Sequence, residues 1–262
     1  MQTDYINLIE TLYLCSLLFI LGLVLGSFGN AWAWRICHGE KISHGRSHCP
    51  NCGHVLSAKD LVPLFSFIFL KGRCRYCSEK ISLRYPASEA VMGIYFLSVY
   101  LTYAISLTTI RFLILGFILF VCSLTDLETM EIPDALLLAA AAVSLLRFFE
   151  GEGWKSCALS MLSGALAVSV PLLIIVLIAD KVLKKESMGG GDIKMVAVLG
   201  LHFGAAKMLL LLIIACIIGL LAAYAMKKKK DAAFPFGPAL ALAGWITALF
   251  GQSIVNWYIG LL

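Results

Sequence analysis

Long apolar runs constrain the fold of this 262-residue chain more than any other feature. They cover roughly 8–34, 87–107, 110–125, 133–149, 156–180, 193–203, 204–226 and 236–262. A helix needs about 20 apolar residues to cross a bilayer, so the sixth run is too short to cross alone. With 60% hydrophobic and only 14% charged residues, the composition is that of a membrane protein. We therefore expect an all-α polytopic membrane protein with about eight transmembrane helices.

The basic residues predict how these helices are oriented. If the N-terminus faces outward, the inward segments hold 17 of the 21 Lys and Arg residues, including Lys227 to Lys230. Only Arg111, Arg147, Lys155 and Lys207 then lie outside. This asymmetry follows the positive-inside rule. The net charge of +5 does not indicate nucleic-acid binding, because the basic residues flank membrane segments.

The loop between the first two runs, residues 35–86, contains a metal-binding pattern. Cys49 and Cys52 form one CxxC pair, Cys74 and Cys77 form a second, and 21 residues separate the pairs. Four thiolates from tight loops suit tetrahedral Zn²⁺ and leave no coordination position open for catalysis. Two disulfides are the alternative, which a cytoplasmic placement of the loop disfavours. The sequence predicts a zinc ribbon with a structural metal ion in this loop.

Two aspartates lie at the edges of apolar runs, where a carboxylate is costly and is therefore a functional candidate. Asp126 ends the run 110–125, and Asp192 follows the glycines 189–191. Each also has an ordinary explanation, Asp126 as a polar interfacial residue and Asp192 as a helix N-cap after a flexible turn. In the predicted topology both lie at the cytoplasmic edge. Two carboxylates that share a proton can activate water against an amide, so the pair predicts aspartic protease chemistry.

Helix ends give two further expectations about the acids. Asp192 begins a helix and Asp126 ends one, so the macrodipole favours an ionised Asp192, which we expect to be the base. Asp134 follows Pro133, and a proline followed by an acid is typical of a helix start.

Five blocks of the chain, in order, resemble the bacterial prepilin peptidases, or type IV leader peptidases, which are intramembrane aspartic proteases. The blocks are Gly26-Ser27-Phe28-Gly29-Asn30 with Arg35; the cysteine pairs with 64–66 and 71–77; 81–86 with Glu89; the segments of Asp126 and Asp192; and Pro235-Phe236-Gly237-Pro238. The resemblance implies that Asp126 and Asp192 are the two catalytic aspartates.

The same resemblance implies a substrate and a second activity. The substrates would be type IV prepilins and pseudopilins, cleaved behind a basic leader on the cytoplasmic side of a bacterial inner membrane. Many members also methylate the new N-terminus with S-adenosylmethionine, and here Arg84 and Glu89 are the candidate donor-binding residues, with a structural ion pair as the alternative. Partners would be these substrates and membrane lipid, without nucleic acid.

The implied organisation has three parts. Residues 1–34 form the first transmembrane helix, 35–86 the methyltransferase-associated zinc loop, and 87–262 the transmembrane peptidase domain. Two other functions compete with this one. A cation-coupled transporter would also use glycine-broken helices with carboxylates, and an assembly scaffold would use the zinc ribbon to bind a cytoplasmic partner.

Overall fold

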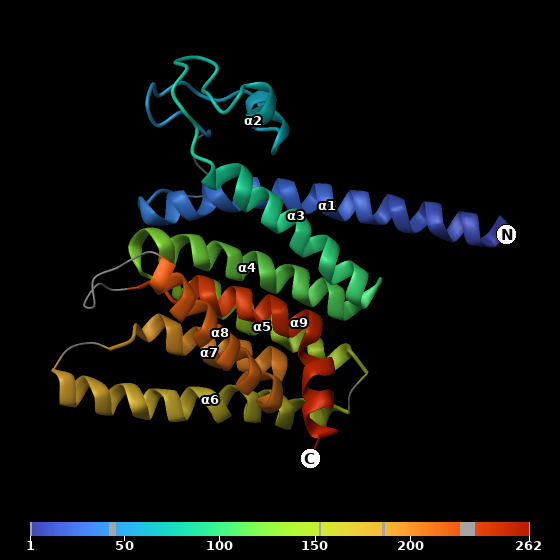
Figure 1. The fold of residues 1–262 in the computed structure, drawn as a ribbon, viewed down its shortest axis with the longest axis vertical. Helices are drawn as coiled ribbons and strands as arrows, with labels where there is room; N and C mark the ends of the chain where they lie inside the picture. The colour runs from blue at the N-terminus through green and yellow to red at the C-terminus, as the bar shows by residue number, and fades with distance from the viewer. Residues whose placement is uncertain (1, 42–45, 152, 185–186, 226–233, 262) are drawn as a thin grey trace. The chain divides into compact units, whose positions relative to one another are not determined.

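The computed structural model describes residues 2–41, 46–151, 153–184, 187–225 and 234–261, so Lys227 to Lys230 lie outside the described residues. The described chain is helical and contains no strand, only two isolated β-bridges. This confirms the predicted all-α class. The chain divides into two compact units, Met1–Ala104 and Ile105–Leu262, and each is described by itself (Figure 1).

The first unit is built on two long helices. These are α1 (Gln2–Cys37) and α3 (Arg84–Tyr103), which pack side by side (Figure 1). The loop between them contains a short 3₁₀ turn, η1 (Ala58–Asp60), and one short helix, α2 (Phe65–Phe69). The cysteine pairs lie in this loop, so the helix pair forms the base on which the loop is mounted.

Small residues bring α1 and α3 into backbone contact. A Cβ atom on Gly22 would lie 2.6 Å from the carbonyl oxygen of Met92. One on Gly26 would lie 2.9 Å from the Cα atom of Glu89. The two glycines are four residues apart, the spacing with which small residues let membrane helices approach closely.

The second unit contains the remaining helices of the described chain. These are α4 (Leu107–Thr129), α5 (Asp134–Ser144), η2 (Leu145–Phe149), α6 (Trp154–Leu183), α7 (Gly190–Phe203), α8 (Ala205–Ala225) and α9 (Gly237–Ile259). Helix α4 packs against α5 and α9, while α7 packs against α5, α6, α8 and α9. Leu115, Met195, Leu199, Leu211 and Leu240 are fully buried and form the core between these helices.

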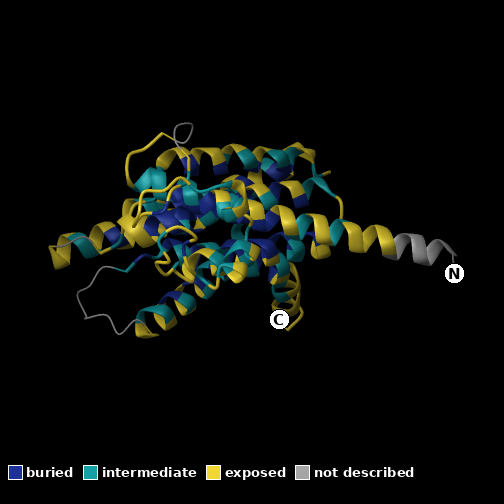
Figure 2. Ribbon diagram, turned by 90° about the horizontal axis from the view of Figure 1, so that it is seen from above, coloured by how far each residue is buried: buried dark blue, intermediate teal, exposed yellow. Residues whose placement is uncertain are grey.

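Five helical segments of the described chain are long and apolar enough to cross a membrane: Ile9–Cys37, Leu107–Thr129, Trp154–Leu183, Gly190–Ala225 and Gly237–Ile259. The fourth contains both α7 and α8, which are separated at Gly204, where φ is +74°. Exposed residues run along the helices (Figure 2). They include large apolar residues such as Leu138, Leu220 and Tyr224. Exposed apolar surface on this scale fits a lipid environment, and the chain is a multi-pass membrane protein.

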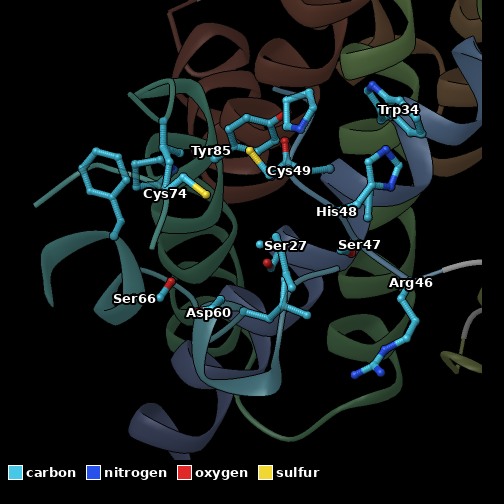
Figure 3. A pocket seen from close by; sticks show the side chains of 18 of the residues that line it. Ser27, Trp34, Arg46, Ser47, His48, Cys49, Asp60, Ser66, Cys74 and Tyr85 are labelled. Carbon is cyan, nitrogen blue, oxygen red and sulfur yellow. The ribbon is translucent and has the colours of Figure 1, made fainter. Parts of the chain in front are cut away.

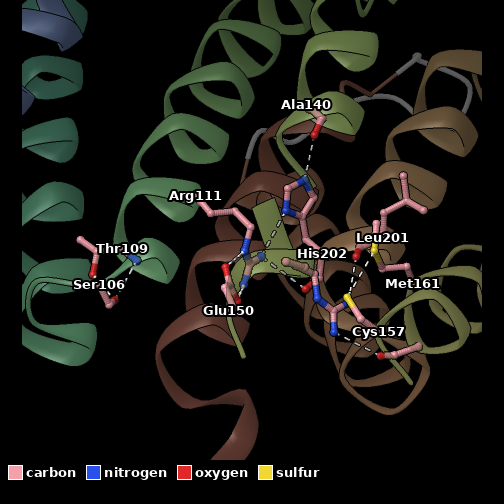
Figure 4. A network of polar contacts seen from close by, with 11 residues as sticks. Ser106, Thr109, Arg111, Ala140, Glu150, Cys157, Met161, Leu201 and His202 are labelled. Atoms are coloured by element: carbon pink, nitrogen blue, oxygen red, sulfur yellow. Dashed lines mark hydrogen bonds and ion pairs between the residues drawn. The ribbon is translucent and has the colours of Figure 1, made fainter. Parts of the chain in front are cut away.

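A buried polar network joins the helices of the second unit at the N-terminal end of α4 (Figure 4). Arg111 forms a bidentate ion pair with Glu150, with its second contact at 3.1 Å. Its guanidinium also lies 3.2 Å from Nδ1 of His202, which must therefore accept the hydrogen bond. The Nε2 atom of His202 then carries the proton and donates to the carbonyl of Ala140 at 2.9 Å. The network thus connects α4, α5 and α7.

Candidate active site and metal centre

Asp126 lies in the last turn of α4, at the opposite end from the Arg111 network. The helix ends at Thr129, and the C-cap residue Met130, with φ at +57°, donates its N–H to the Asp126 carbonyl at 2.9 Å. Asp126 is 4% exposed as a residue, and its Oδ2 accepts a hydrogen bond from the backbone N–H of Gly237 at 2.8 Å. A Cβ atom on Gly237 would lie 2.9 Å from the same oxygen. A side chain at this position would therefore displace the Asp126 carboxylate from its place.

Asp192 lies in the first turn of α7, two residues after the helix begins. Its Oδ1 atom is buried and has no hydrogen-bond partner among the described residues. Gly191 contributes to this placement, because a Cβ atom there would lie 3.1 Å from Cβ of Ile132. The start of α7 therefore packs on the segment that follows α4. A buried carboxylate oxygen without a partner is costly and calls for an explanation beyond folding.

Asp126 and Asp192 come from different helices and lie within electrostatic range of each other. Asp126 ends its own helix, yet its carboxylate also faces the N-terminus of α9, which begins at Gly237. Both acids thus lie beside a helix N-terminus, where backbone N–H groups favour an anion. Helix ends therefore do not distinguish the two acids, and Asp192 as the base stays a prediction.

Asp134 is the first residue of α5, after Pro133, as its sequence context predicted. Its carboxylate pairs with Nζ of Lys194 at 2.7 Å, and both side chains are more than half exposed. An exposed pair of this kind contributes about 0–1 kcal/mol. It connects the start of α5 to the start of α7, close in sequence to Asp192.

The four predicted zinc ligands converge in the first unit. The Sγ atoms of Cys49, Cys52, Cys74 and Cys77 all lie within 4.8 Å of one another, and Cys49 and Cys77 are 3.9 Å apart. A zinc ion about 2.3 Å from each of four tetrahedral sulfur ligands places those sulfurs about 3.8 Å apart. The cluster therefore fits such an ion. His48 and His54, which flank the first pair, instead make ring contacts with Trp34 and Tyr76 respectively.

The two cysteine pairs sit in loops that repeat the same hydrogen bonds. In the first, the Cys49 N–H donates to the carbonyl of His54 at 3.0 Å and its carbonyl accepts from Gly53 at 2.8 Å. In the second, the corresponding bonds of Cys74, with Glu79 and Ser78, are 2.8 and 2.9 Å. The residue after each second cysteine has positive φ, +69° at Gly53 and +59° at Ser78. Paired turns, without the strands of a ribbon, hold the cysteines.

A cavity of about 240 Å³ opens beside the cysteine cluster, within the first unit (Figure 3). Its walls come from the end of α1, the loop and the start of α3, and the buried cysteines Cys49 and Cys74 are part of the lining. Glu89 also lines the cavity. Arg84, the other candidate donor-binding residue, is exposed and does not belong to the lining.

Comparison with known proteins decides the family. The chain matches the Bacterial Peptidase A24 N-terminal domain over residues 20–103 and the Type IV leader peptidase family over residues 113–224. It is 33% identical to a Bacillus subtilis protein named "Prepilin leader peptidase/N-methyltransferase", over 93% of this chain and 97% of that one. The chain belongs to the type IV leader peptidase family.

Other relatives of this leader peptidase carry the same name. Identity is 31% with a protein of Pseudomonas putida, over 94% of this chain and 93% of that one. Identity is 34% with a protein of Aeromonas hydrophila, over 82% of this chain and 74% of that one. No solved structure is similar to the chain. The family matches confirm the resemblance seen in the sequence, and the chain is an enzyme of the peptidase class.

The sequence did not predict two contacts of the site. The segment from Pro235 to Pro238 was part of the resemblance without a role, whereas the structure shows that its Gly237 N–H binds the Asp126 carboxylate. Asn30, in the first motif, donates from Nδ2 to Oγ of Ser88 at 2.7 Å and so connects α1 to α3. Motif spacing indicated that these positions mattered, but only the fold supplies their partners.

Proposed function

We propose that the chain cleaves the leader of type IV prepilins or pseudopilins with Asp126 and Asp192 as its catalytic pair. The observation that carries the proposal is the buried, unpartnered Oδ1 of Asp192 within electrostatic range of a buried Asp126. Among the described residues neither acid has a cationic partner that would offset its desolvation, whereas hydrolysis of an amide needs both acids.

In the proposed mechanism the pair shares one proton. The ionised carboxylate accepts a proton from water while the water oxygen attacks the scissile carbonyl carbon. The protonated carboxyl donates to the carbonyl oxygen, which gives a tetrahedral gem-diol. The carboxyl that took the water proton passes it to the amide nitrogen, the C–N bond breaks, and the other carboxylate recovers a proton from one hydroxyl, so that the pair again shares one proton. The Gly237 N–H fixes the Asp126 carboxylate in its rotamer throughout. Because the acids titrate as a pair, the roles are assigned to the pair.

The test is cleavage of a model prepilin in liposomes by the wild type, Asp126→Asn and Asp192→Asn. Both variants keep the size of the side chain and remove the acid, so cleavage should fall by at least about 10²-fold in each, the range that acid–base groups contribute. Glu131→Gln, which neutralises an exposed acid between α4 and α5, is the matched control. Full activity in a folded Asp126→Asn or Asp192→Asn would remove that acid from the mechanism and favour the transporter or scaffold.

The proposal extends to topology and to a second reaction. Each of the eight apolar runs contains a helix of the described chain, counting α5 with η2 as one, and we assign all eight to the membrane. The N-terminus would face outward and both acids the cytoplasm, as the distribution of Lys and Arg supports. The four cysteines would hold structural zinc, and S-adenosylmethionine would supply a methyl group to the newly exposed N-terminus, as the names of the relatives indicate.

A further inference from the structure

We propose that the cavity beside the cysteine cluster is the binding site for the methyl donor, with Glu89 facing a positively charged centre of that donor. This inference rests on the proposed methyl transfer and adds the site where the donor binds. The cavity is formed by the first unit alone, which is the part matched by the N-terminal family model. Methyl-donor binding is thereby assigned to a different unit from the two aspartates.

Glu89 is the residue that most requires a ligand. It is 8% exposed on α3 and lines the cavity. Its Oε2 atom accepts a hydrogen bond from the N–H of Leu64 at 2.9 Å, and among the described residues no cationic side chain pairs with it. A buried carboxylate without a counter-charge is strongly disfavoured. A cation that enters the cavity would remove that cost.

The other charges of the lining suit a ligand that carries both signs. Arg35 and Arg46 bring two positively charged residues to the lining, and Glu40 brings a negatively charged one. The Asp60 carboxylate is already bound by Arg75 at 2.6 Å, so it belongs to the wall. S-adenosylmethionine has a sulfonium, an ammonium and a carboxylate. The N-terminus of a cleaved pilin has only the ammonium, and it gives no reason for positively charged residues in the lining.

Aromatic side chains complete the match to a nucleoside. Trp34, at the end of α1, and Tyr85, at the start of α3, both line the cavity (Figure 3). Trp34 is fixed in place because its ring stacks on His38 with centroids 4.2 Å apart and meets His48 edge-on at 5.6 Å. Rigid aromatic rings bind a flat heterocycle at little entropic cost. The cavity measures about 240 Å³. Ligand pockets usually measure about 300–1,000 Å³, so the cavity would enclose only part of the donor, and the rest would extend outside it.

The experiment measures donor binding directly, separately from either activity. S-adenosylmethionine and its product S-adenosylhomocysteine, whose sulfur is a neutral thioether, are titrated calorimetrically into the full-length, zinc-loaded protein in detergent. The variants are Glu89→Gln, which keeps an acceptor for the Leu64 N–H, and Trp34→Leu. Glu79→Gln, an exposed acid of the same loop outside the cavity lining, is the matched control. Zinc content and melting temperature establish that each variant is folded.

We expect Glu89→Gln to weaken S-adenosylmethionine binding at least tenfold, Trp34→Leu to weaken both ligands, and Glu79→Gln to bind as the wild type does. Unchanged binding of S-adenosylmethionine by folded Glu89→Gln and Trp34→Leu would overturn the site. If Glu89→Gln weakens binding of a cleaved pilin peptide and not of the donor, the cavity holds the acceptor and the proposal is wrong. A wild type that cleaves prepilin but binds no S-adenosylmethionine would instead refute the proposed methyl transfer itself.

Discussion

Asp60 stabilises the wall of the cavity through a single carboxylate. Its two oxygens accept hydrogen bonds from the Ser57 hydroxyl at 2.7 Å, the Ser57 N–H at 3.0 Å, the Arg75 guanidinium at 2.6 Å and the Tyr76 hydroxyl at 3.1 Å. These donors, the Ser57 hydroxyl first among them and against the opposing effect of burial, hold the pKa of Asp60 well below its usual range. One residue thus connects the η1 turn to the second cysteine pair.

Asp60→Asn should lower the thermal stability of the loop by about 1–3 kcal/mol, because an amide NH₂ would face donors that need an acceptor. A carboxylate whose folded pKa is lowered contributes stability that is present above its ordinary pKa, about 4, and is lost as pH falls through the folded value. Asp60 is therefore fully ionised wherever zinc stays bound. The loss should be equal at pH 6 and pH 8 in thermal unfolding monitored by zinc release. A loss that changes between these values would assign the effect to another group.

At the level of single residues, the sequence predicted side chains better than their partners. The cluster of Cys49, Cys52, Cys74 and Cys77 could be predicted, because the spacing within each pair is local and two CxxC pairs are typical of a metal site. The contact between Asp126 and Gly237 was not readable, because it joins positions 111 residues apart and the partner is a backbone N–H. A backbone donor leaves no signature in residue type.

Among the helices, the contact between α6 and α7 controls where Asp192 lies. A Cβ atom on Gly200 would come within 2.3 Å of the Gly164 carbonyl oxygen, and one on Gly164 within 2.2 Å of the Gly200 oxygen. The obstacle is backbone, so it cannot move aside as a flexible side chain would. Asp192 is two turns earlier on the same helix, about 12 Å away at 1.5 Å per residue.

Gly200→Ala should therefore push α7 away from α6, costing about 1–3 kcal/mol of stability and slowing prepilin cleavage. The matched control for stability is Gly190→Ala on the same helix, because a Cβ atom there meets nothing within 4 Å. Melting temperatures of both variants in detergent provide the comparison. If Gly200→Ala has the same melting temperature as Gly190→Ala and the wild type, the close contact does not limit the packing of α7.

The Arg111 network gives a second prediction about helix packing. Arg111 is 4% exposed and Glu150 15%, so Arg111→Met would leave a largely buried carboxylate without its partner, at a cost of about 3–5 kcal/mol. The double variant Arg111→Met with Glu150→Leu should recover most of that loss, since both charges are then gone. The free energies of unfolding of the wild type, the two single variants and the double variant form a double-mutant cycle, and reversible unfolding in mixed micelles measures them. Strictly additive losses would show that the ion pair contributes nothing to the packing of α4.

The apolar runs of the sequence predicted the positions of the long helices well, because burial in lipid requires continuous apolar helices. They predicted less well which helices are long and apolar enough to cross the membrane. The helix α3, with Arg84 and Glu89 in its first turns, and the 11-residue α5 are not among the five spans that qualify by length and hydropathy. The break between α7 and α8 depends on a single glycine, Gly204. Hydropathy sums over a window and does not resolve such a break.

Over the whole molecule, the two compact units divide the chemistry. The cysteines and the cavity belong to Met1–Ala104, while Asp126, Asp192 and the helices that hold them belong to Ile105–Leu262. The loop of the first unit has little secondary structure, and bound zinc contributes about 10–16 kcal/mol to the folding of small sites of this kind. The second unit has its own buried core, including Met195, Leu199 and Leu240.

Zinc removal should therefore affect the two units unequally. A chelator that strips the wild type should unfold the cysteine loop and abolish binding of S-adenosylmethionine, because Cys49 and Cys74 are part of the cavity wall. Most prepilin cleavage should persist, because the core that positions Asp126 and Asp192 contains none of the four zinc ligands. Metal content, donor binding and cleavage are followed in one titration, and zinc is then added back. Cleavage that falls in proportion to zinc content would mean that the loop is needed for the peptidase activity. The assignment of the two activities to separate units would then be wrong.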